Sequence, residues 1–291
     1  MTATLHQRAP APHELNAGFR WEEHPGAGRA LTAEQRAGFD RDGFVVLERV
    51  IPPDVLARAV AEIDPAEAEL EAFLRTTDDG KVFIARADEI TFTVHLVARS
   101  PWLAAFVRAR LFRDLAHDLV GPDVRMYWDQ AVYKKPGTEA PFPWHQDNGY
   151  AFVEPQAYLT CWIALTDATL DNGCPLVVPG LHRSGTLHHE LTDLGFICLD
   201  DVDEPVPVEV PAGSIVVFST LTPHCTGANR TDETRKSYIV QFAHDGAEVV
   251  RRDGQGAETR EACTDPARQF PVLVAGEAPP GAPVDWPDPA G

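Results

Sequence analysis

A histidine and an aspartate lie two positions apart in the segment PFPWHQDNGY, residues 141–150. In a β-strand, residues i and i+2 point to the same face, so His145 and Asp147 converge while Gln146 points away. An imidazole and a carboxylate on one face suit two ligands of a metal ion. The same spacing recurs at His188 and Glu190, in a polar segment that we expect to be solvated. A pair of this kind alone is more often a hydrogen-bonded pair, so a metal site requires a third ligand.

His224 supplies that ligand, in a turn between the apolar segments GSIVVFS and KSYIVQF. Two histidines and one carboxylate form the facial triad of non-haem Fe(II) oxygenases, which leaves coordination positions open. A structural zinc site would instead close with four protein ligands, usually including cysteine. Cys225 adjoins His224, but neighbouring side chains diverge, so we do not expect it at the metal. The residue types therefore favour iron.

An arginine follows His224 after eleven residues, at the start of the next apolar segment. An antiparallel return would bring Arg235 back beside the metal, where its guanidinium is suited to clamp a carboxylate with two hydrogen bonds. The hydroxyl of Thr226 is placed to add a third. Without the upstream histidine, Arg235 would be interpreted as one half of a surface salt bridge.

Further candidates flank these positions. Gln130 and Lys134 share one face of the preceding strand, so both are candidates for binding the co-substrate. A buried, unpaired lysine is costly, which favours an anionic partner, although a rim position is an equal alternative. Trp144, Asn148 and Tyr150 are candidates for lining a substrate pocket, with core packing as the alternative for the two rings.

The elements that must position these residues fall into a helical front and a strand-rich middle. A capping-box spacing at Thr32 and Gln35 predicts a helix, a second helix begins near Pro53, and a third runs from Ser100-Pro101 to Gly121. Short β-type segments separated by turn residues follow, without alternating helices, which predicts an antiparallel sandwich or jelly-roll. The predicted class is mostly β with flanking helices.

The chain is expected to form one oxygenase domain over residues 31–250, with a helical front at 31–121 and a jelly-roll at 122–250. Residues 1–30 are predicted to be an irregular N-terminal segment, and residues 251–291 a polar, Pro-rich tail.

Composition restricts the partners. The formal charge of −19 disfavours nucleic acid and anionic membranes. No apolar run reaches the length of a membrane helix and the start lacks a signal-peptide core, so we expect a cytoplasmic protein, as a monomer or weak homodimer. Five scattered cysteines without a C-x-x-C pair indicate free thiols.

The sequence resembles the phytanoyl-CoA dioxygenase-like branch of the Fe(II)/2-oxoglutarate-dependent oxygenases over roughly residues 31 to 245. The resemblance rests on LTAEQRAGFDRDGFVVLERV, DQAVYKKPG leading to WHQD, WIALTDATLDNGCPLVVPGLH and PHCTGANRTDETR, in this order. It implies a double-stranded β-helix, iron bound by His145, Asp147 and His224, and 2-oxoglutarate held by Arg235 and Thr226, with O2 as the other co-substrate. WHQDNGYAF is not the ectoine hydroxylase signature. A carboxylate at Asp147 disfavours halogenation, because the family's halogenases carry a small residue there.

The expected function is oxidation of a small organic metabolite, most simply hydroxylation, with release of succinate and CO2. Desaturation, epoxidation, cyclisation and epimerisation use the same cofactors and stay open. A non-catalytic jelly-roll binding module would not need the triad, and a zinc hydrolase would normally carry an H-E-x-x-H motif, which the sequence lacks. The acidic balance favours a free, partly apolar substrate over a CoA thioester.

Overall fold

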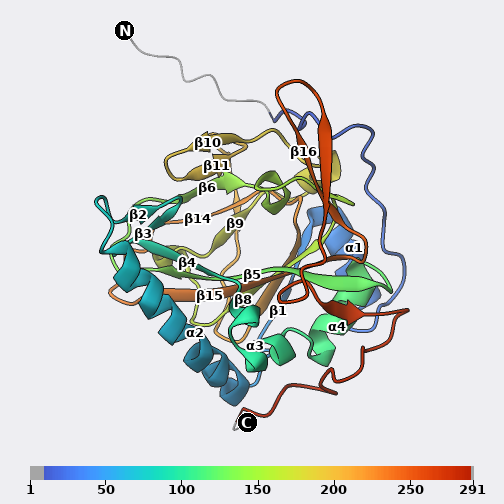
Figure 1. Ribbon diagram of the computed structural model, residues 1–291, viewed down its shortest axis with the longest axis horizontal. Helices are drawn as coiled ribbons and strands as arrows, with labels where there is room; N and C mark the ends of the chain where they lie inside the picture. The colour runs from blue at the N-terminus through green and yellow to red at the C-terminus, as the bar shows by residue number, and fades with distance from the viewer. Residues whose placement is uncertain (1–9, 290–291) are drawn as a thin grey trace.

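A computed structural model describes residues 10–289 as two antiparallel sheets that face each other, with helices against the outer side of the larger one (Figure 1). The fold is mostly β with flanking helices, and it is the predicted jelly-roll. In the order of pairing, the larger sheet contains β1 (Phe44–Leu47), β13 (Ile215–Ser219), β8 (Leu159–Ala164), β15 (Arg235–His244), β5 (Val124–Lys134), β4 (Ile90–Val94), β3 (Ala85–Arg86) and β2 (Lys81–Val82), and β18 (Pro271–Leu273) also pairs with β5.

The smaller sheet carries both histidines of the predicted triad. Its strands are β12 (Val206–Pro207), β9 (Pro175–Val177), β14 (His224–Thr226) and β6 (Phe142–His145). Two further hairpin units stand at the open end of the barrel: β10 (Glu190–Thr192) with β11 (Gly195–Ile197), and β16 (Glu248–Arg252) with β17 (Glu258–Ala262) and β7 (Val153–Glu154). Four short 3-10 helices lie in the connections: η1 (Leu96–Ala98), η2 (Asp147–Gly149), η3 (Leu170–Asn172) and η4 (Leu181–Ser184).

Local sequence signals explain where the first two helices begin. Helix α1 (Ala33–Asp42) has Thr32 as its N-cap, with the complete capping box to Gln35. Helix α2 (Pro53–Leu74) has a proline in its first turn. Together with the remaining helices, α2 packs on the outer face of the larger sheet and forms one apolar core there, while a second apolar cluster fills the space between the two sheets.

The expected third helix is in fact two helices, α3 (Pro101–Phe106) and α4 (Arg110–Leu119). Ser100 caps the first as predicted, by accepting a hydrogen bond from Leu103 N. Phe106 and Phe112 are both fully buried in the same core, where their rings meet edge to face. Side chains six residues apart on one straight helix point about 120° away from each other. The break between the two helices lets both rings face the sheet. It follows from packing in the tertiary structure, so no residue near it in the sequence predicts it.

The terminal segments lie against the domain rather than apart from it. Buried Asp118 accepts hydrogen bonds from the backbone N–H groups of Arg29, Ala30 and Leu31, which holds the N-terminal segment on α4. At the other end, Trp286 stacks on Phe106. The segment predicted as the helical front, residues 31–121, also contains four strands of the larger sheet: β1, β2, β3 and β4. The division into three segments stays a prediction.

No helix between residues 10 and 289 is both long enough and apolar enough to span a lipid bilayer.

Candidate metal centre

The two histidines meet directly across a pair of antiparallel strands. In the register of β14 with β6, His224 is opposite His145, and the ring centroids are 4.2 Å apart. The Nδ1 atom of His145 lies 2.9 Å from Pro143 O, and the Nδ1 atom of His224 lies 3.0 Å from Thr222 O. These carbonyls accept hydrogen bonds from Nδ1–H, which leaves each Nε2 as the atom with a free lone pair.

Asp147 reaches the same point by a route that differs from the expected strand alternation. Strand β6 ends at His145, the chain turns at Gln146, and Asp147 is the first residue of η2. Its Oδ1 lies 3.7 Å from Nε2 of His145 and 3.8 Å from Nε2 of His224. The Thr160 hydroxyl donates a 2.6 Å hydrogen bond to Oδ2 and fixes the carboxylate.

The three ligand atoms all lie within 4.8 Å of one another. Burial, followed by the proximity of His224, lowers the pKa of His145 well below its ordinary value, so its imidazole is neutral, as a metal ligand must be. Two imidazole nitrogens and one carboxylate oxygen are the donor set of a non-haem iron site, and the site has no fourth protein ligand among the described residues. Cys225, next in sequence to His224, packs instead with Trp144 and Leu187.

Arg235 is buried with part of its hydrogen-bonding capacity unused. Its Nη1 donates to Ser237 Oγ at 2.7 Å, whereas its Nε and Nη2 have no partner. The guanidinium carbon lies 5.5 Å from the ring centroid of Trp162, and burial lowers the pKa of Arg235 to about 10. A buried cation with two unpaired donors is costly unless an anion is bound. The group fits a carboxylate such as that of 2-oxoglutarate.

Lys134 is the partner of Arg235 in the register of β5 and β15, and it is fully buried. Its ammonium donates to the backbone carbonyls of Ala140 (3.2 Å) and Gly227. Burial and the adjacent Arg235 lower its pKa to about 7. Lys134 therefore adds positive potential at this end of the barrel while its own donors are engaged. Thr226 is also buried here, and its carbonyl accepts a weak 3.5 Å bond from Lys134.

Gln130 does not reach the arginine end. It lies four residues before Lys134 on β5, opposite Ile239 rather than Arg235. Its Oε1 accepts a 3.3 Å bond from Trp128 Nε1. This position is closer to the open end of the barrel, so the structure separates Gln130 from the group at Arg235.

The three candidates for the substrate pocket divide. Trp144 points away from the metal ligands into a packed cluster with Leu187 and Cys198, because side chains alternate along β6. Asn148 is fully buried, where it accepts from Val153 N (2.9 Å) and donates to Thr186 Oγ1 (2.6 Å), so it is structural.

Of the three candidates, Tyr150 is the one whose ring contacts a metal ligand. It lies edge-on to His145, with centroids 5.4 Å apart, and to Phe196 at 5.2 Å.

Sequence reasoning did not find the residues that support Asp147. Gln241 Nε2 donates to Thr160 Oγ1 at 3.2 Å, which completes a chain from β15 through β8 to the carboxylate. His189, in the segment expected to be solvated, is buried and accepts a 2.9 Å bond from Gln146 N. Alternation along β8 places Thr160 on the same face as Trp162. This pattern was the sequence feature from which a role for Thr160 inside the barrel could have been predicted.

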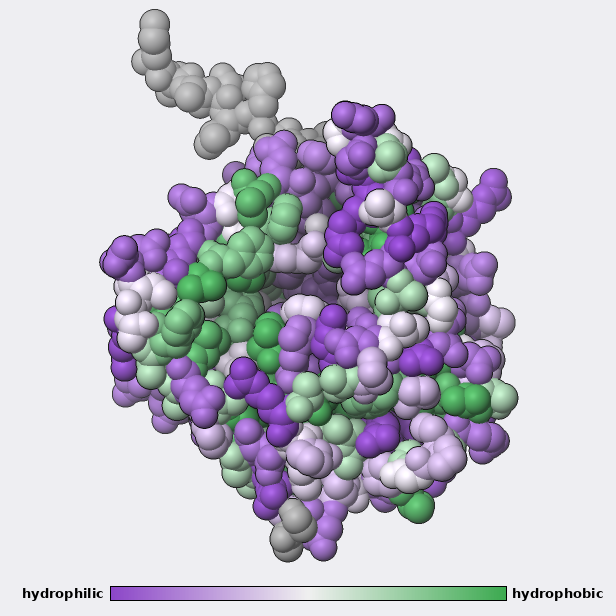
Figure 2. Space-filling model, in the orientation of Figure 1, coloured by the Kyte–Doolittle hydropathy of each residue, from purple (hydrophilic) through white to green (hydrophobic). Residues whose placement is uncertain are grey.

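The open end of the barrel has two different walls. Figure 2 shows a hollow between the region of β10 and β11, where the surface is apolar, and the region of β16, where it is polar. Tyr127 and Trp128, in the first half of β5, line a small pocket of about 150 Å³ together with residues of the β16–β17 hairpin.

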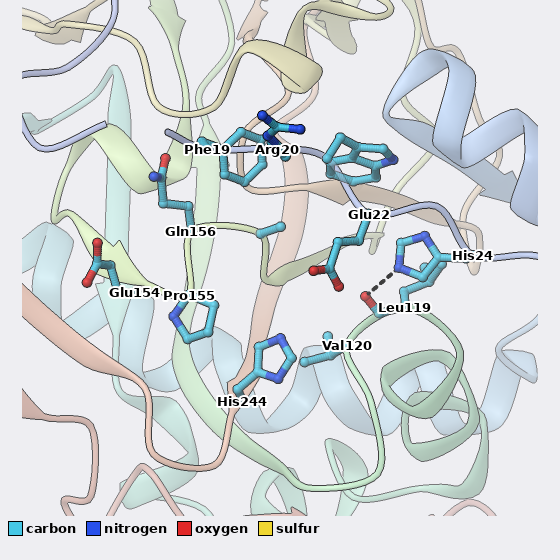
Figure 3. Close-up of a pocket in the computed structure, with 12 residues that line it drawn as sticks. Phe19, Arg20, Glu22, His24, Leu119, Val120, Glu154, Pro155, Gln156 and His244 are labelled. Atoms are coloured by element: carbon cyan, nitrogen blue, oxygen red, sulfur yellow. Dashed lines mark hydrogen bonds between the residues drawn. The ribbon is translucent and has the colours of Figure 1, made fainter. Parts of the chain in front are cut away.

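A second pocket, of about 550 Å³, lies away from the triad between the N-terminal segment, α4 and the start of β8 (Figure 3). His24 lines it but is engaged by Asp40 (2.7 Å) and Leu119 O (3.2 Å). Glu22 and His244 point into it without a third potential metal ligand beside them. We assign no chemistry to this pocket.

Comparison with known proteins identifies a family. The model of the phytanoyl-CoA dioxygenase family matches residues 39–237, which include the triad and Arg235. A probable phytanoyl-CoA dioxygenase of Caenorhabditis elegans is 28% identical over 255 residues, covering 80% of this chain and 82% of its own length. A dioxygenase of a Cladobotryum species is 30% identical over 226 residues, covering 70% and 72% of the two chains.

A similar solved structure is that of the epimerase SnoN in complex with Fe3+, alpha ketoglutarate and nogalamycin RO. It superimposes with a TM-score of 0.63 at 21% identity, covering 82% of this chain and 97% of that one. At this identity the likeness establishes the fold alone.

Proposed function

The chain belongs to the phytanoyl-CoA dioxygenase family, and from this premise we propose that it hydroxylates an unactivated C–H bond of a small organic metabolite at the site formed by His145, Asp147 and His224. The protein is an Fe(II)/2-oxoglutarate-dependent oxygenase. The observation that carries the site assignment is the convergence of two Nε2 atoms and one carboxylate beside a buried arginine with unpaired donors.

The roles of the residues follow from their contacts. His145, Asp147 and His224 would hold the iron, which when bound supplies the oxidising chemistry that couples decarboxylation of 2-oxoglutarate to substrate oxidation. Thr160 holds Asp147 in place through its hydroxyl. Pro143 O holds the ring of His145 and so directs its Nε2. No residue needs to move to bring the ligand atoms together.

Arg235 would hold the distal carboxylate of 2-oxoglutarate with its two free donors, with Thr226 beside it. The atom balance is one C–H bond, O2 and 2-oxoglutarate consumed, and one C–OH group, succinate and CO2 formed. Trp162, which lies against the guanidinium, excludes water from the charged pair and strengthens it.

Anaerobic absorption tests the metal assignment. The full chain with Fe(II) and 2-oxoglutarate is expected to develop a visible charge-transfer band that Zn(II) does not give. The variants Asp147→Ala and His224→Ala are expected to lose the band, because each removes one ligand, while circular dichroism shows that they remain folded. A full band in either variant would remove that residue from the site.

Product analysis with 18O2 tests the reaction. Hydroxylation incorporates one labelled oxygen atom into the product and one into succinate. A product with two hydrogens fewer and no label would indicate desaturation or cyclisation, and an unlabelled isomer would indicate epimerisation.

A further inference from the structure

Three exposed apolar side chains belong to the β2–β3 and β10–β11 hairpins. Val82, Phe83 and Leu191 are 44%, 56% and 62% exposed. Figure 2 shows a green surface in the region of β2, β3, β10 and β11, beside the hollow. We name this surface the apolar rim and define it by six residues: Val82, Phe83, Ile84, Leu191, Leu194 and Phe196.

The rim is one surface, although its residues come from two hairpins more than a hundred residues apart. Lys81 Nζ and Arg86 Nη2 both donate to Asp193 O, at 3.1 and 2.9 Å, and so fasten the β2–β3 turn to the β10–β11 turn. Beneath the turns, Gly195 (φ +126°) leaves no room for a side chain, because a Cβ there would lie 2.6 Å from the Tyr150 hydroxyl and 3.4 Å from Ile84 Cγ2. The two hairpins are therefore packed together.

A row of aromatic rings connects the rim to the metal ligands. From His145, the ring of Tyr150 is 5.4 Å away, and Phe196 of the rim is 5.2 Å beyond it. The ring of Phe142 also contacts His145, at 4.9 Å, and Phe92 lies 5.3 Å from Phe142. A ligand lying along the rim would thus meet a continuous apolar lining that ends beside the metal.

Phe83 is an additional sign that the rim binds something apolar. Its φ of +52° is in the left-handed region that favours glycine and asparagine. A phenylalanine in this conformation is strained, yet the ring is more than half exposed. The strain and the exposure are both unfavourable for the free protein, and a ligand that covers the ring would offset them.

The opposite wall offers no comparable attraction. On the β16–β17 hairpin, Arg251 pairs with Glu261 at 2.8 Å, and Arg260 pairs with Glu154 at 2.9 Å. Their charges are neutralised by neighbours, so an ionic substrate would have to compete with these pairs. Recognition by burial of apolar surface on the rim is the stronger alternative.

We propose that the apolar rim binds the apolar body of the primary substrate, a neutral molecule with an extended acyl chain or a fused-ring skeleton rather than a compact charged metabolite. This inference rests on the proposed function of the metal centre. In the bound state, the apolar body would lie across Phe83 and Leu191 and continue past Phe196 and Tyr150 toward His145.

The neutral fluorescent dye N-phenyl-1-naphthylamine tests the rim directly. The full chain with Fe(II) and 2-oxoglutarate is titrated with the dye under argon, as wild type and as the variant carrying Phe83→Asn and Leu191→Gln. Asparagine tolerates the left-handed backbone, and both side chains are exposed, so the fold is retained. The expected result is an affinity about tenfold weaker in the variant, which corresponds to about 1.4 kcal/mol.

Leu170→Gln is the matched control, because Leu170 is a leucine that is 49% exposed and lies in η3, outside the rim. It is expected to leave dye affinity unchanged. An unchanged affinity in the rim variant, or an equal loss in the control, would overturn the proposal. The charge-transfer band is recorded in the same samples: its absence in the wild type refutes the metal assignment, whereas a normal band with rim-independent dye binding refutes the rim alone.

Competition against the bound dye distinguishes the two kinds of apolar body. Stronger displacement by octanamide indicates an acyl chain, and stronger displacement by 2-naphthol indicates a ring system; either result supports the proposal. Displacement by glycine betaine, a compact zwitterion, at the same concentration would overturn it.

Discussion

Arg235 is a buried cation that has no anionic partner among the described residues, so a bound anion would stabilise it. The guanidinium is 1% exposed, and two of its nitrogens lack a hydrogen-bond partner. Lys134 lies directly opposite, and burial together with Arg235 lowers its pKa to about 7. Protonation of this lysine beside the unpaired guanidinium is therefore unfavourable in the apo protein, and an anion bound at this position favours the protonated form.

We expect Arg235→Gln to weaken 2-oxoglutarate binding by about ten- to a hundredfold, since a lost bidentate charged bond is worth roughly 1.5–3 kcal/mol. A titration of the charge-transfer band measures the affinity. Apo stability is expected not to fall by a similar amount, because the charge has no counterion without ligand. Arg230→Gln, at an exposed arginine five residues earlier, is the control. Unchanged affinity in Arg235→Gln would assign the carboxylate to another group, with Lys134 the first to test.

For individual residues, the sequence predicted the three metal ligands, but it did not predict the residues that hold Asp147 in place. The types and spacing of His145, Asp147 and His224 sufficed to propose the triad, because coordination chemistry restricts the choice. The roles of Thr160 and Gln241 depend on the register between β8 and β15, which the spacing of residues does not define. Trp144 is adjacent to His145 in the sequence and was therefore a candidate for lining the substrate pocket, with core packing as the alternative. Strand alternation directs its side chain away from the metal ligands and into a packed cluster.

At the scale of the secondary-structure elements, the buried side chain of Asp129 connects β5 to β15 and to η1 by hydrogen bonds. It lies on β5, where its Oδ2 accepts from Tyr238 OH (2.9 Å) on β15 and from Val97 N (3.1 Å) on η1, while its Oδ1 has no partner. Burial raises its pKa to about 6, from an ordinary value of 3.8. The groups that face it are neutral donors with the more distant Arg268, so desolvation decides the direction of the shift.

Asp129→Asn is expected to change how stability depends on pH. Because the folded-state pKa is raised, Asp129 favours folding below about pH 4, and this contribution is lost as the pH rises through about 6. Relative to wild type, the variant should therefore gain up to about 3 kcal/mol in unfolding free energy between pH 4 and pH 7.5. Urea unfolding across this range measures the difference.

The exposed Asp171→Asn serves as the control for that experiment. A pH-dependent difference no larger for Asp129→Asn than for this control would contradict the raised pKa of Asp129. Any constant offset between variant and wild type reflects the new amide group and does not affect this comparison.

Elements whose ends depend on local chemistry were predictable, and those that depend on packing were not. Thr32 and Pro53 mark the starts of α1 and α2 because capping is a contact between residues a few positions apart. The break between α3 and α4 follows from the need to bury Phe106 and Phe112 in one core. The end of β6 at His145 is equally non-local, since it brings Asp147 to Thr160 on another strand.

For the whole molecule, the formal charge of −19 and the position of the basic residues act together on substrate choice. The arginines nearest the hollow belong to the β16–β17 hairpin and are paired with glutamates. A CoA thioester carries several phosphate charges. It would approach a protein of net negative charge, past hairpin arginines that are paired with glutamates and past Lys81 and Arg86, which both donate to Asp193 O.

We therefore expect free amides to be preferred over the CoA thioesters of the same acyl groups, by at least about tenfold in kcat/KM, a difference of about 1.4 kcal/mol. Succinate release across matched pairs measures the preference. The argument is electrostatic, so it also predicts a salt effect: raising the ionic strength from 0.01 M to 0.15 M shortens the screening length from about 30 to about 8 Å, and the disadvantage of the thioesters should shrink. A preference for thioesters that weakens with salt would show the opposite, namely that the hairpin arginines exchange their glutamate partners for phosphate.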